Sequence, residues 1–206
     1  MKVRKVQVIR IVVDVECDIM VQSGRQSEFR TGKIGIAGGE IFMPLRVILL
    51  NGASSSGKST LAKSLQKYIK DNRKEEYIIT SIDEFLNMTA DEPIYEDDVF
   101  EISPMLCRKV LNILETGQGV IIDHVITSER IYKQLTEILR EYKLIKVQTK
   151  CPLNELKRRE KERKNRYVGS AEASYEYLYP KEDYDLTLNT HELSSEECAK
   201  RICELL

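Results

Sequence analysis

The sequence predicts an α/β protein with a mainly parallel five-stranded sheet and helices on both faces. From Leu45 onward, short apolar segments alternate with segments of helical periodicity, which is the pattern of strands joined by helices. The run 47–50 is apolar without a break, as a strand covered on both faces requires. The chain has 206 residues, which suits one compact domain, and its 42% share of hydrophobic residues excludes a disordered chain.

The strand and helix segments follow one another in a regular order. A helix is expected to begin near Lys58, because Leu61, Leu65 and Ile69 recur every four residues. The last helix is expected to begin at Ser194, which has the spacing of a capping box. The other predicted helices cover 102–115, 129–142 and 153–164, and the predicted strands are 47–50, 77–82, 119–122, 144–148 and 185–188.

Residues 1–43 differ in amino-acid composition and pattern from the rest of the chain. They are rich in β-branched residues at first and then pass through a polar stretch and a glycine-rich turn, which predicts a strand or a hairpin. They hold no recognisable motif. We interpret them as an N-terminal extension, either β-rich or not native to the core, that precedes a domain over residues 44–206.

The distribution of charge and cysteine predicts a cytoplasmic protein. Charged residues interrupt the apolar segment behind the basic start, so the N-terminus does not match a secretion signal, and no run approaches the roughly 18 apolar residues of a membrane span. The 5 cysteines have irregular spacing without a CxxC pair, which indicates neither a disulfide framework nor a zinc site. The net charge of −1 excludes binding to extended nucleic acid through bulk charge.

The strongest signal is the segment 52–59, Gly-Ala-Ser-Ser-Ser-Gly-Lys-Ser, which fits the phosphate-loop pattern G-x-x-x-x-G-K-[ST]. A strand precedes it and a helix follows in register, which argues against a chance turn. Its glycines let backbone N–H groups point at phosphate oxygens, and the helix N-terminus adds its dipole. Lys58 is expected to reach the terminal phosphates, and the Ser59 hydroxyl to ligate Mg²⁺. The predicted nucleotide-binding residues here are Gly52, Ala53, Ser54, Ser55, Ser56, Gly57, Lys58, Ser59 and Thr60.

Polar side chains follow three predicted strands at the edge where a parallel sheet binds its ligands. Asp83 is predicted to accept the proton of a substrate hydroxyl that attacks the γ-phosphate, with a helix N-cap as the alternative. Asp123 is predicted to hold Mg²⁺, directly or through water, rather than to be a solvated strand end. His124 is a candidate substrate ligand or a structural hydrogen-bond partner. The last strand is followed by Asn189, Thr190 and His191.

The charged run at residues 157–166 predicts an arginine-rich lid. It follows the fourth strand and ends near Gly169, where a helical segment can close over a nucleotide. Guanidinium groups at Arg159, Arg163 and Arg166 would stabilise charge on the transferring phosphoryl group, by about 10³- to 10⁵-fold in rate in the best cases. The alternative is a solvated helix face that carries mixed charges.

Two further stretches are compatible with an acceptor site. The acidic stretch at 91–98 predicts an exposed loop over that site. Five tyrosines between the lid and the last strand either wall a pocket for an apolar or aromatic substrate or pack beneath the lid; they are Tyr167, Tyr175, Tyr177, Tyr179 and Tyr184.

Several of these features occur together in a known family. The phosphate loop, Ile82-Asp83, Ile121-Ile122-Asp123 and the stretch 184–199 make the chain resemble the chloramphenicol phosphotransferase-like P-loop kinases over about residues 45–206. The resemblance implies an ATP-dependent kinase, monomeric or homodimeric, that phosphorylates a hydroxyl of a small molecule. It further implies that Asp83 is the base, that the three arginines form the lid, and that Asn189, Thr190 and His191 lie near the adenine.

The chain also departs from that family. Residues 1–42 have no counterpart in the resemblance, so we expect them to be dispensable for catalysis. The stretch 84–102, where acceptor-binding residues are expected, differs from the antibiotic kinase, and His124 follows the third-strand Asp123. Both departures point to an acceptor other than chloramphenicol.

Two other functions remain open from the sequence. One is a different P-loop phosphotransferase, such as a toxin-type kinase acting on nucleotide sugars or a kinase acting on nucleic-acid ends. The other is a nucleotide-binding switch that hydrolyses ATP slowly, in which Asp83 would not be needed for turnover.

Overall fold

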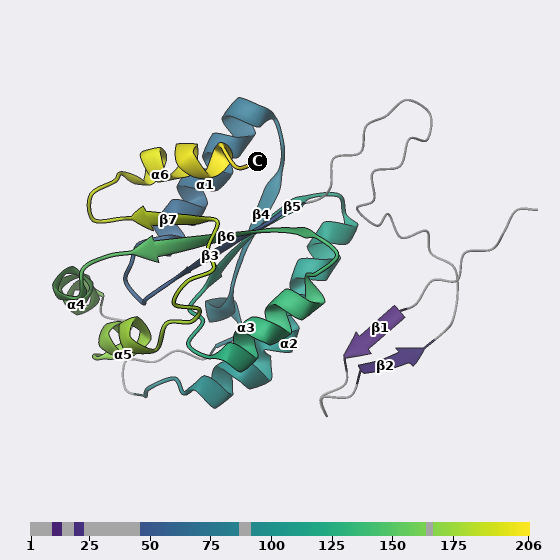
Figure 1. The fold of residues 1–206 in the computed structure, drawn as a ribbon, viewed down its shortest axis with the longest axis horizontal. Helices are drawn as coiled ribbons and strands as arrows, with labels where there is room; N and C mark the ends of the chain where they lie inside the picture. Colours follow the sequence, from purple (N-terminus) through teal and green to yellow (C-terminus); the bar gives the residue numbers. More distant parts are fainter. Residues whose placement is uncertain (1–9, 14–18, 23–45, 87–91, 164–166) are drawn as a thin grey trace, which may run out of the picture.

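A single five-stranded sheet forms the centre of the protein. The computed structural model describes residues 10–13, 19–22, 46–86, 92–163 and 167–206. All neighbouring strands of the sheet are parallel, in the order β4-β5-β3-β6-β7, which confirms the predicted architecture (Figure 1). The strands are β3 (Arg46–Gly52), β4 (Tyr77–Ser81), β5 (Gly119–His124), β6 (Lys143–Lys150) and β7 (Leu186–Asn189).

Helices cover both faces of this sheet. The apolar sides of α1 (Lys58–Arg73) and α6 (Ser195–Cys203) share one core with Ile48 and Leu50 of β3. The apolar sides of α2 (Glu96–Glu115) and α3 (Glu129–Ile138) share a second core with Val47 and Leu49. Because successive side chains of a strand point to opposite faces, an uninterrupted apolar run is what a doubly covered strand needs. Within the described residues, no helix combines the length and apolar character that crossing a membrane requires.

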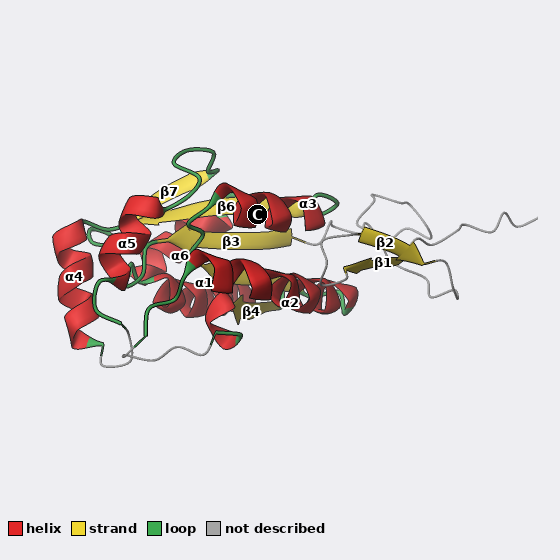
Figure 2. Ribbon diagram, turned by 90° about the horizontal axis from the view of Figure 1, so that it is seen from below, coloured by secondary structure: helices red, strands yellow, loops and turns green. Residues whose placement is uncertain are grey.

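Two helices lie beyond the carboxyl ends of the strands. Figures 1 and 2 show α4 (Leu153–Glu162) and α5 (Ser170–Tyr177) at this end of the sheet. A small apolar cluster holds them against the start of the phosphate loop; it consists of Ala53, Cys151, Leu156 and Ala171. The predicted site edge of the sheet is therefore covered by these helices.

The start of α2 differs from the prediction. The helix begins at Glu96 rather than at residue 102, so the loop predicted for 91–98 is wrong for its last three residues. Glu96, Asp97 and Asp98 form the first turn, where acidic side chains stabilise the helix dipole, and Asp98 accepts a hydrogen bond from the Tyr95 N–H at 2.8 Å. Asp91 lies outside the described residues.

The end of β4 also differs. The strand stops at Ser81, and a single 3₁₀ turn, η1 (Ile82–Glu84), follows it. Ser81 caps this turn by accepting a hydrogen bond from the Asp83 N–H at 3.2 Å, so the alternative role of Asp83 as the N-cap is wrong.

Other differences concern helix ends and one missed helix. The α3 helix ends at Ile138 rather than at 142, and α4 ends at Glu162. The α5 helix was not predicted, because only Ala171 and Ser174 of its eight residues are buried and no apolar stripe marks it in the sequence.

The N-terminal segment forms local β-structure. Strands β1 (Arg10–Val13) and β2 (Ile19–Gln22) pair antiparallel in a separate two-stranded sheet. The hairpin expected from the β-branched residues is thus present. The division of the chain at residue 43, and the dispensability of the extension, stay predictions.

Candidate active site

The phosphate loop joins β3 to α1 in a conformation that its small residues allow. Gly57 and Ser55 have left-handed φ values of 92° and 65°. Gly52 has no room for a side chain, because a Cβ atom there would lie 2.1 Å from Oγ1 of Thr149 on β6. The α1 helix begins at Lys58, so the positive end of its dipole lies at the end of the loop. The loop has the local structure that a polyphosphate site needs.

Three polar side chains of the loop have an environment suited to an anion. Lys58 is 5% exposed, and its ammonium group donates hydrogen bonds of 2.8 Å to the carbonyl oxygens of Gly52 and Ala53. The hydroxyls of Ser54 and Ser55 are buried and have no hydrogen-bond partner within the described part of the chain. An unpaired buried hydroxyl costs free energy, and phosphate oxygens would supply the missing acceptors.

The two predicted metal ligands lie in direct contact. The Ser59 hydroxyl, in the first turn of α1, donates a 2.6 Å hydrogen bond to Oδ2 of Asp123 on β5. Both groups offer the oxygen ligands that Mg²⁺ prefers. Among the described residues, no group of three or more His, Cys, Asp or Glu side chains could hold a metal ion alone.

Asp83 lies close to this pair. It is half-buried in η1 at the carboxyl end of β4, and it lines one cavity together with Lys58, Ser59 and Asp123. Strands β4, β5 and β3 are adjacent in the sheet, so three strand ends bring these side chains to a common edge. The structure thus brings together the predicted base, the phosphate-loop lysine and the predicted metal ligands.

His124 lines the same cavity. Its side chain is fully buried. Burial lowers the pKa of His124 to about 4, whereas a backbone hydrogen bond to Val125 and the Asp83 carboxylate act in the opposite direction. Both interpretations of His124, as a substrate ligand and as a structural hydrogen-bond partner, stay predictions.

The shared cavity has a volume of about 690 Å³ and one largely apolar wall. This volume is within the roughly 300–1,000 Å³ of ligand pockets. Glu96 lines it too, but its charge is balanced by Arg130, whose Nε lies 2.6 Å from Oε1; this hydrogen bond lowers the pKa of Glu96. The apolar and aromatic lining comes from Ile82, Leu86, Pro93, Ile94, Tyr95, Val99, Val125, Tyr167, Ala173 and Tyr177.

The five tyrosines do not share one environment. Tyr167 and Tyr177 line the cavity. Tyr184 instead accepts a 2.8 Å hydrogen bond from Asn51, and the Tyr179 carbonyl accepts another of the same length. Tyr175 is 49% exposed and does not line the cavity.

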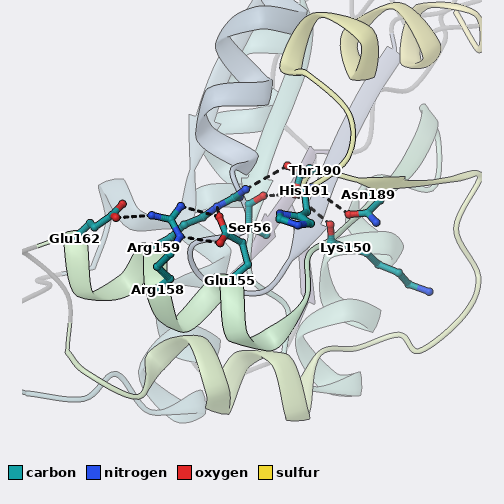
Figure 3. A network of polar contacts seen from close by, with 9 residues as sticks. All are labelled: Ser56, Lys150, Glu155, Arg158, Arg159, Glu162, Asn189, Thr190 and His191. Carbon is teal, nitrogen blue, oxygen red and sulfur yellow. Dashed lines mark hydrogen bonds and ion pairs between the residues drawn. The ribbon is translucent and has the colours of Figure 1, made fainter.

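A second, smaller cavity of about 230 Å³ lies beside the end of the phosphate loop, at Gly57 and Thr60. The Thr190 hydroxyl connects this side to the loop, because it lies 2.6 Å from the Ser56 carbonyl oxygen and 3.1 Å from that of Lys150 (Figure 3). His191 is exposed, and its N–H donates to the side chain of Asn189 at 3.1 Å. The cavity is lined by Gly57, Thr60, Leu61, Arg159, Thr190, Leu193, Ser195 and Cys198, so of the three predicted adenine-loop residues only Thr190 reaches it.

The two described lid arginines, Arg159 and Arg163, line different cavities. Arg159 lies over the loop on the side of the smaller cavity: its Nε donates to Glu155 at 2.7 Å and its Nη2 to the Thr190 carbonyl at 3.3 Å (Figure 3). Arg163 lines the larger cavity. Arg166 lies outside the described residues. Arg158, next in sequence, points its guanidinium at Glu155 and Glu162 on its own helix (Figure 3).

Sequence reasoning missed three residues that shape this site. Asn51, fully buried at the end of β3, accepts a 2.9 Å hydrogen bond from the Ile126 N–H besides its bonds to the two tyrosines. Ser174 of α5 accepts a 2.9 Å hydrogen bond from the Ser54 N–H of the phosphate loop. Buried Glu160 of α4 accepts hydrogen bonds from the Gly169 and Ala171 N–H groups at 3.0 and 2.7 Å, which ties α4 to α5. Only Asn51, a polar residue in an apolar strand, carries a local signal.

Comparisons with known proteins agree on the fold. A model of the family described as "Chloramphenicol phosphotransferase-like protein" matches residues 45–206, and no curated protein shows significant similarity to the chain. The APS kinase CysC of Mycobacterium tuberculosis, solved with AMPPNP and APS, is 19% identical with a TM-score of 0.63, over 79% of this chain and 97% of that one. A gluconokinase of Sinorhizobium meliloti is 14% identical with a TM-score of 0.57, over 79% and 95% of the two chains.

A further similar structure is the shikimate kinase of Acinetobacter baumannii in complex with shikimate. It is 19% identical with a TM-score of 0.52, over 78% of this chain and 92% of that one. At these identities the likeness establishes a P-loop kinase fold and leaves the acceptor open, because one fold serves many substrates.

Proposed function

The chain belongs to the chloramphenicol phosphotransferase-like family, and on that premise we propose that it transfers the γ-phosphate of ATP to a hydroxyl group of a small molecule. The family and the fold make it a phosphotransferase of the P-loop kind. The observation that carries the finer proposal is the convergence of Lys58, Asp83 and Asp123 on one cavity, with Ser59 in contact with Asp123.

The phosphate loop would bind the triphosphate. Backbone N–H groups of the loop, together with the hydroxyls of Ser54 and Ser55, would donate hydrogen bonds to phosphate oxygens. Lys58 would leave its two carbonyl partners for the β- and γ-phosphates, whose negative charge is a stronger acceptor. Ser59 and Asp123 would hold Mg²⁺, which when bound neutralises charge on these phosphates.

Asp83 would act as the general base. The acceptor hydroxyl gives its proton to the Asp83 carboxylate while its oxygen forms a bond to the γ-phosphorus. The bond between that phosphorus and the bridging oxygen of ADP breaks, so ADP leaves and a phosphate ester is formed. Arg163, on the cavity wall, and Arg159, over the loop, would stabilise charge on the phosphates from two sides.

The acceptor side of the cavity favours an uncharged molecule. Apart from Lys58, Arg163 is the one cationic residue among the described residues that line it, and the carboxylate of Asp83 would repel an anionic acceptor. The apolar and aromatic wall would bury an apolar or aromatic part of the substrate.

A transfer assay tests this proposal. The chain is incubated with ATP labelled on the γ-phosphate and a panel of hydroxylated small molecules, with short RNA carrying a free 5′ hydroxyl in a parallel series. We expect label in an organic phosphate ester. Label on the RNA end alone would support a nucleic-acid-end kinase instead, and release of inorganic phosphate with no acceptor labelled would support a slow nucleotide switch.

A further inference from the structure

We propose that Thr190 is a positioning residue for the phosphate loop. Its hydroxyl would hold the peptide between Ser56 and Gly57 in the orientation that turns the Gly57 N–H toward the nucleotide phosphates. Thr190 would then act through the backbone of the loop rather than through contact with the base. This inference rests on the proposed function, because it takes the loop to bind the triphosphate.

Ser56 is held by the protein through all of its polar groups. The residue is 1% exposed, and its N–H donates a 3.2 Å hydrogen bond to the Ala53 carbonyl oxygen. Its hydroxyl lies 2.9 Å from the Thr149 hydroxyl on β6. Its carbonyl oxygen accepts a 2.6 Å hydrogen bond from the Thr190 hydroxyl (Figure 3). Ser56 is therefore placed to determine the shape of the loop.

The contact with Thr190 fixes the direction of the next N–H group. A peptide bond is planar and trans, so its C=O and N–H point in opposite directions. The Ser56 carbonyl points toward Thr190, which lines the smaller cavity, and the Gly57 N–H consequently points away from Thr190. Gly57 also lines the larger cavity, together with Lys58 and Ser59. The N–H is thereby available to a phosphate that these two residues bind.

Gly57 itself does not select this orientation. Its φ is 92°, and glycine adopts positive and negative φ about equally well. A half-turn of the peptide plane would therefore be tolerated by Gly57, and it would bring the Ser56 carbonyl oxygen toward the phosphates. That oxygen carries partial negative charge and would repel them. A donor from outside the loop is needed to maintain the favourable orientation.

Thr190 has the fixed position that such a donor requires. Its N–H donates to the Lys150 carbonyl oxygen at the end of β6 at 2.9 Å, and its own carbonyl oxygen accepts from Arg159 at 3.3 Å. Its hydroxyl lies 3.1 Å from the Lys150 carbonyl oxygen and has one proton, so the 2.6 Å contact with Ser56 is the stronger one. Strand β6 pairs with β3, which leads into the loop. The donor and the loop are thus supported by neighbouring strands.

Inorganic tripolyphosphate tests the proposal, because it has phosphates and no base. It is titrated with Mg²⁺ into the full chain and into two variants, with calorimetry as the readout. We expect Thr190→Val to bind about tenfold less tightly, and Thr190→Ser, which keeps the hydroxyl, to stay within a few-fold of wild type. Thr187→Val, an exposed change on β7 that removes a hydrogen bond to Gln148, should bind as wild type does.

A second measurement uses the wild-type chain and does not depend on the folding of a variant. The amide proton of Gly57, followed by NMR, should move downfield when tripolyphosphate and Mg²⁺ are added, since it then donates to a charged oxygen. In Thr190→Val this movement should be smaller.

Several results would overturn the inference. Unchanged tripolyphosphate affinity in Thr190→Val would do so, whether AMPPNP binds less tightly, which would indicate a contact with the base, or only the thermal midpoint falls, which would indicate a structural role. So would an equal loss in Thr190→Ser, an unmoved Gly57 amide, or no binding of tripolyphosphate by the wild-type chain. Failure of the proposed phosphoryl transfer is a separate outcome, because binding of tripolyphosphate does not depend on chemistry.

Discussion

The two halves of the candidate site are built in different ways. The nucleotide half comes from one contiguous loop and the first turn of α1, with Asp123 of β5 as the one residue from elsewhere; Lys58 binds loop carbonyls, and Ser59 binds Asp123. The acceptor half is assembled from η1, the start of α2, the end of β5 and α5, and it contains the fully buried His124. The contiguous half would bind the same ligand, ATP, whatever the acceptor is. Residues that line the assembled half can differ without changing the residues that bind ATP.

This difference leads to a separation of kinetic effects. Substitutions in the nucleotide half should reduce transfer to every acceptor. Substitutions in the acceptor half should change which acceptor is used, or how well, while ATP binding is preserved.

The largest effect is expected for Lys58→Met. Removal of the only cation within the phosphate loop leaves charge on the transferring phosphate unbalanced, so kcat/KM should fall by about 10³- to 10⁵-fold for all acceptors. Steady-state transfer assays measure this, with Lys63→Met on the exposed side of α1 as the matched control. A loss confined to some acceptors would contradict the separation of the two halves.

The next effect concerns Asp83→Asn. An amide cannot accept the hydroxyl proton, so kcat should fall by about 10²- to 10⁴-fold, while ATP affinity, measured by calorimetry, should stay within a few-fold of wild type. Asp71→Asn, an exposed change on α1, serves as the control. Unchanged turnover in Asp83→Asn would favour the nucleotide switch.

Gly52→Ala tests how rigid the nucleotide half is. Its Cβ would lie 2.1 Å from Thr149 Oγ1 and 2.6 Å from the Thr149 carbonyl oxygen, and the latter is backbone that cannot rotate away. Overpacking of this kind costs about 1–3 kcal/mol of folding free energy, so the denaturant midpoint should fall and nucleotide affinity with it. If the variant kept wild-type stability and nucleotide affinity, the end of β3 would be able to move away from Thr149, and the prediction of a rigid nucleotide half would be wrong.

A smaller effect is expected for Glu160→Gln. The buried carboxylate accepts two backbone hydrogen bonds from the start of α5, and an amide can retain only one of them with its oxygen. Because α5 forms part of the acceptor wall, KM for the acceptor should rise a few-fold, with KM for ATP less affected. Glu162→Gln, at an exposed position of the same helix, is the control, and an equal rise in both KM values would contradict the assignment of α5.

The sequence predicted the strands and the polar residues at their ends well, and the wall of the acceptor cavity poorly. The five parallel strands and the positions of Lys58, Asp83 and Asp123 follow from local patterns, namely apolar runs, a loop motif and the strand ends. The wall of the acceptor cavity depends on packing between distant segments. It includes α5, which has no apolar stripe in the sequence. It also includes the start of α2, whose acidic residues led to the prediction of a loop.

The arginines show the same limit. Spacing along a charged helix placed Arg159 and Arg163 in one lid, but the two side chains line different cavities. Sequence spacing determines which face of a helix a residue occupies; it does not determine what lies opposite that face. Closure of α4 and α5 as a lid stays a prediction.

The central claim is that the phosphate loop aims ATP at an alcohol that Asp83 deprotonates. A crystal structure with AMPPNP and Mg²⁺ bound tests it most directly. The account predicts that Ser59 and Asp123 lie at the metal and that the Asp83 carboxylate faces the space beyond the γ-phosphorus, with room for one alcohol oxygen between them. A carboxylate turned away from that phosphorus, or a nucleotide bound elsewhere, would contradict it.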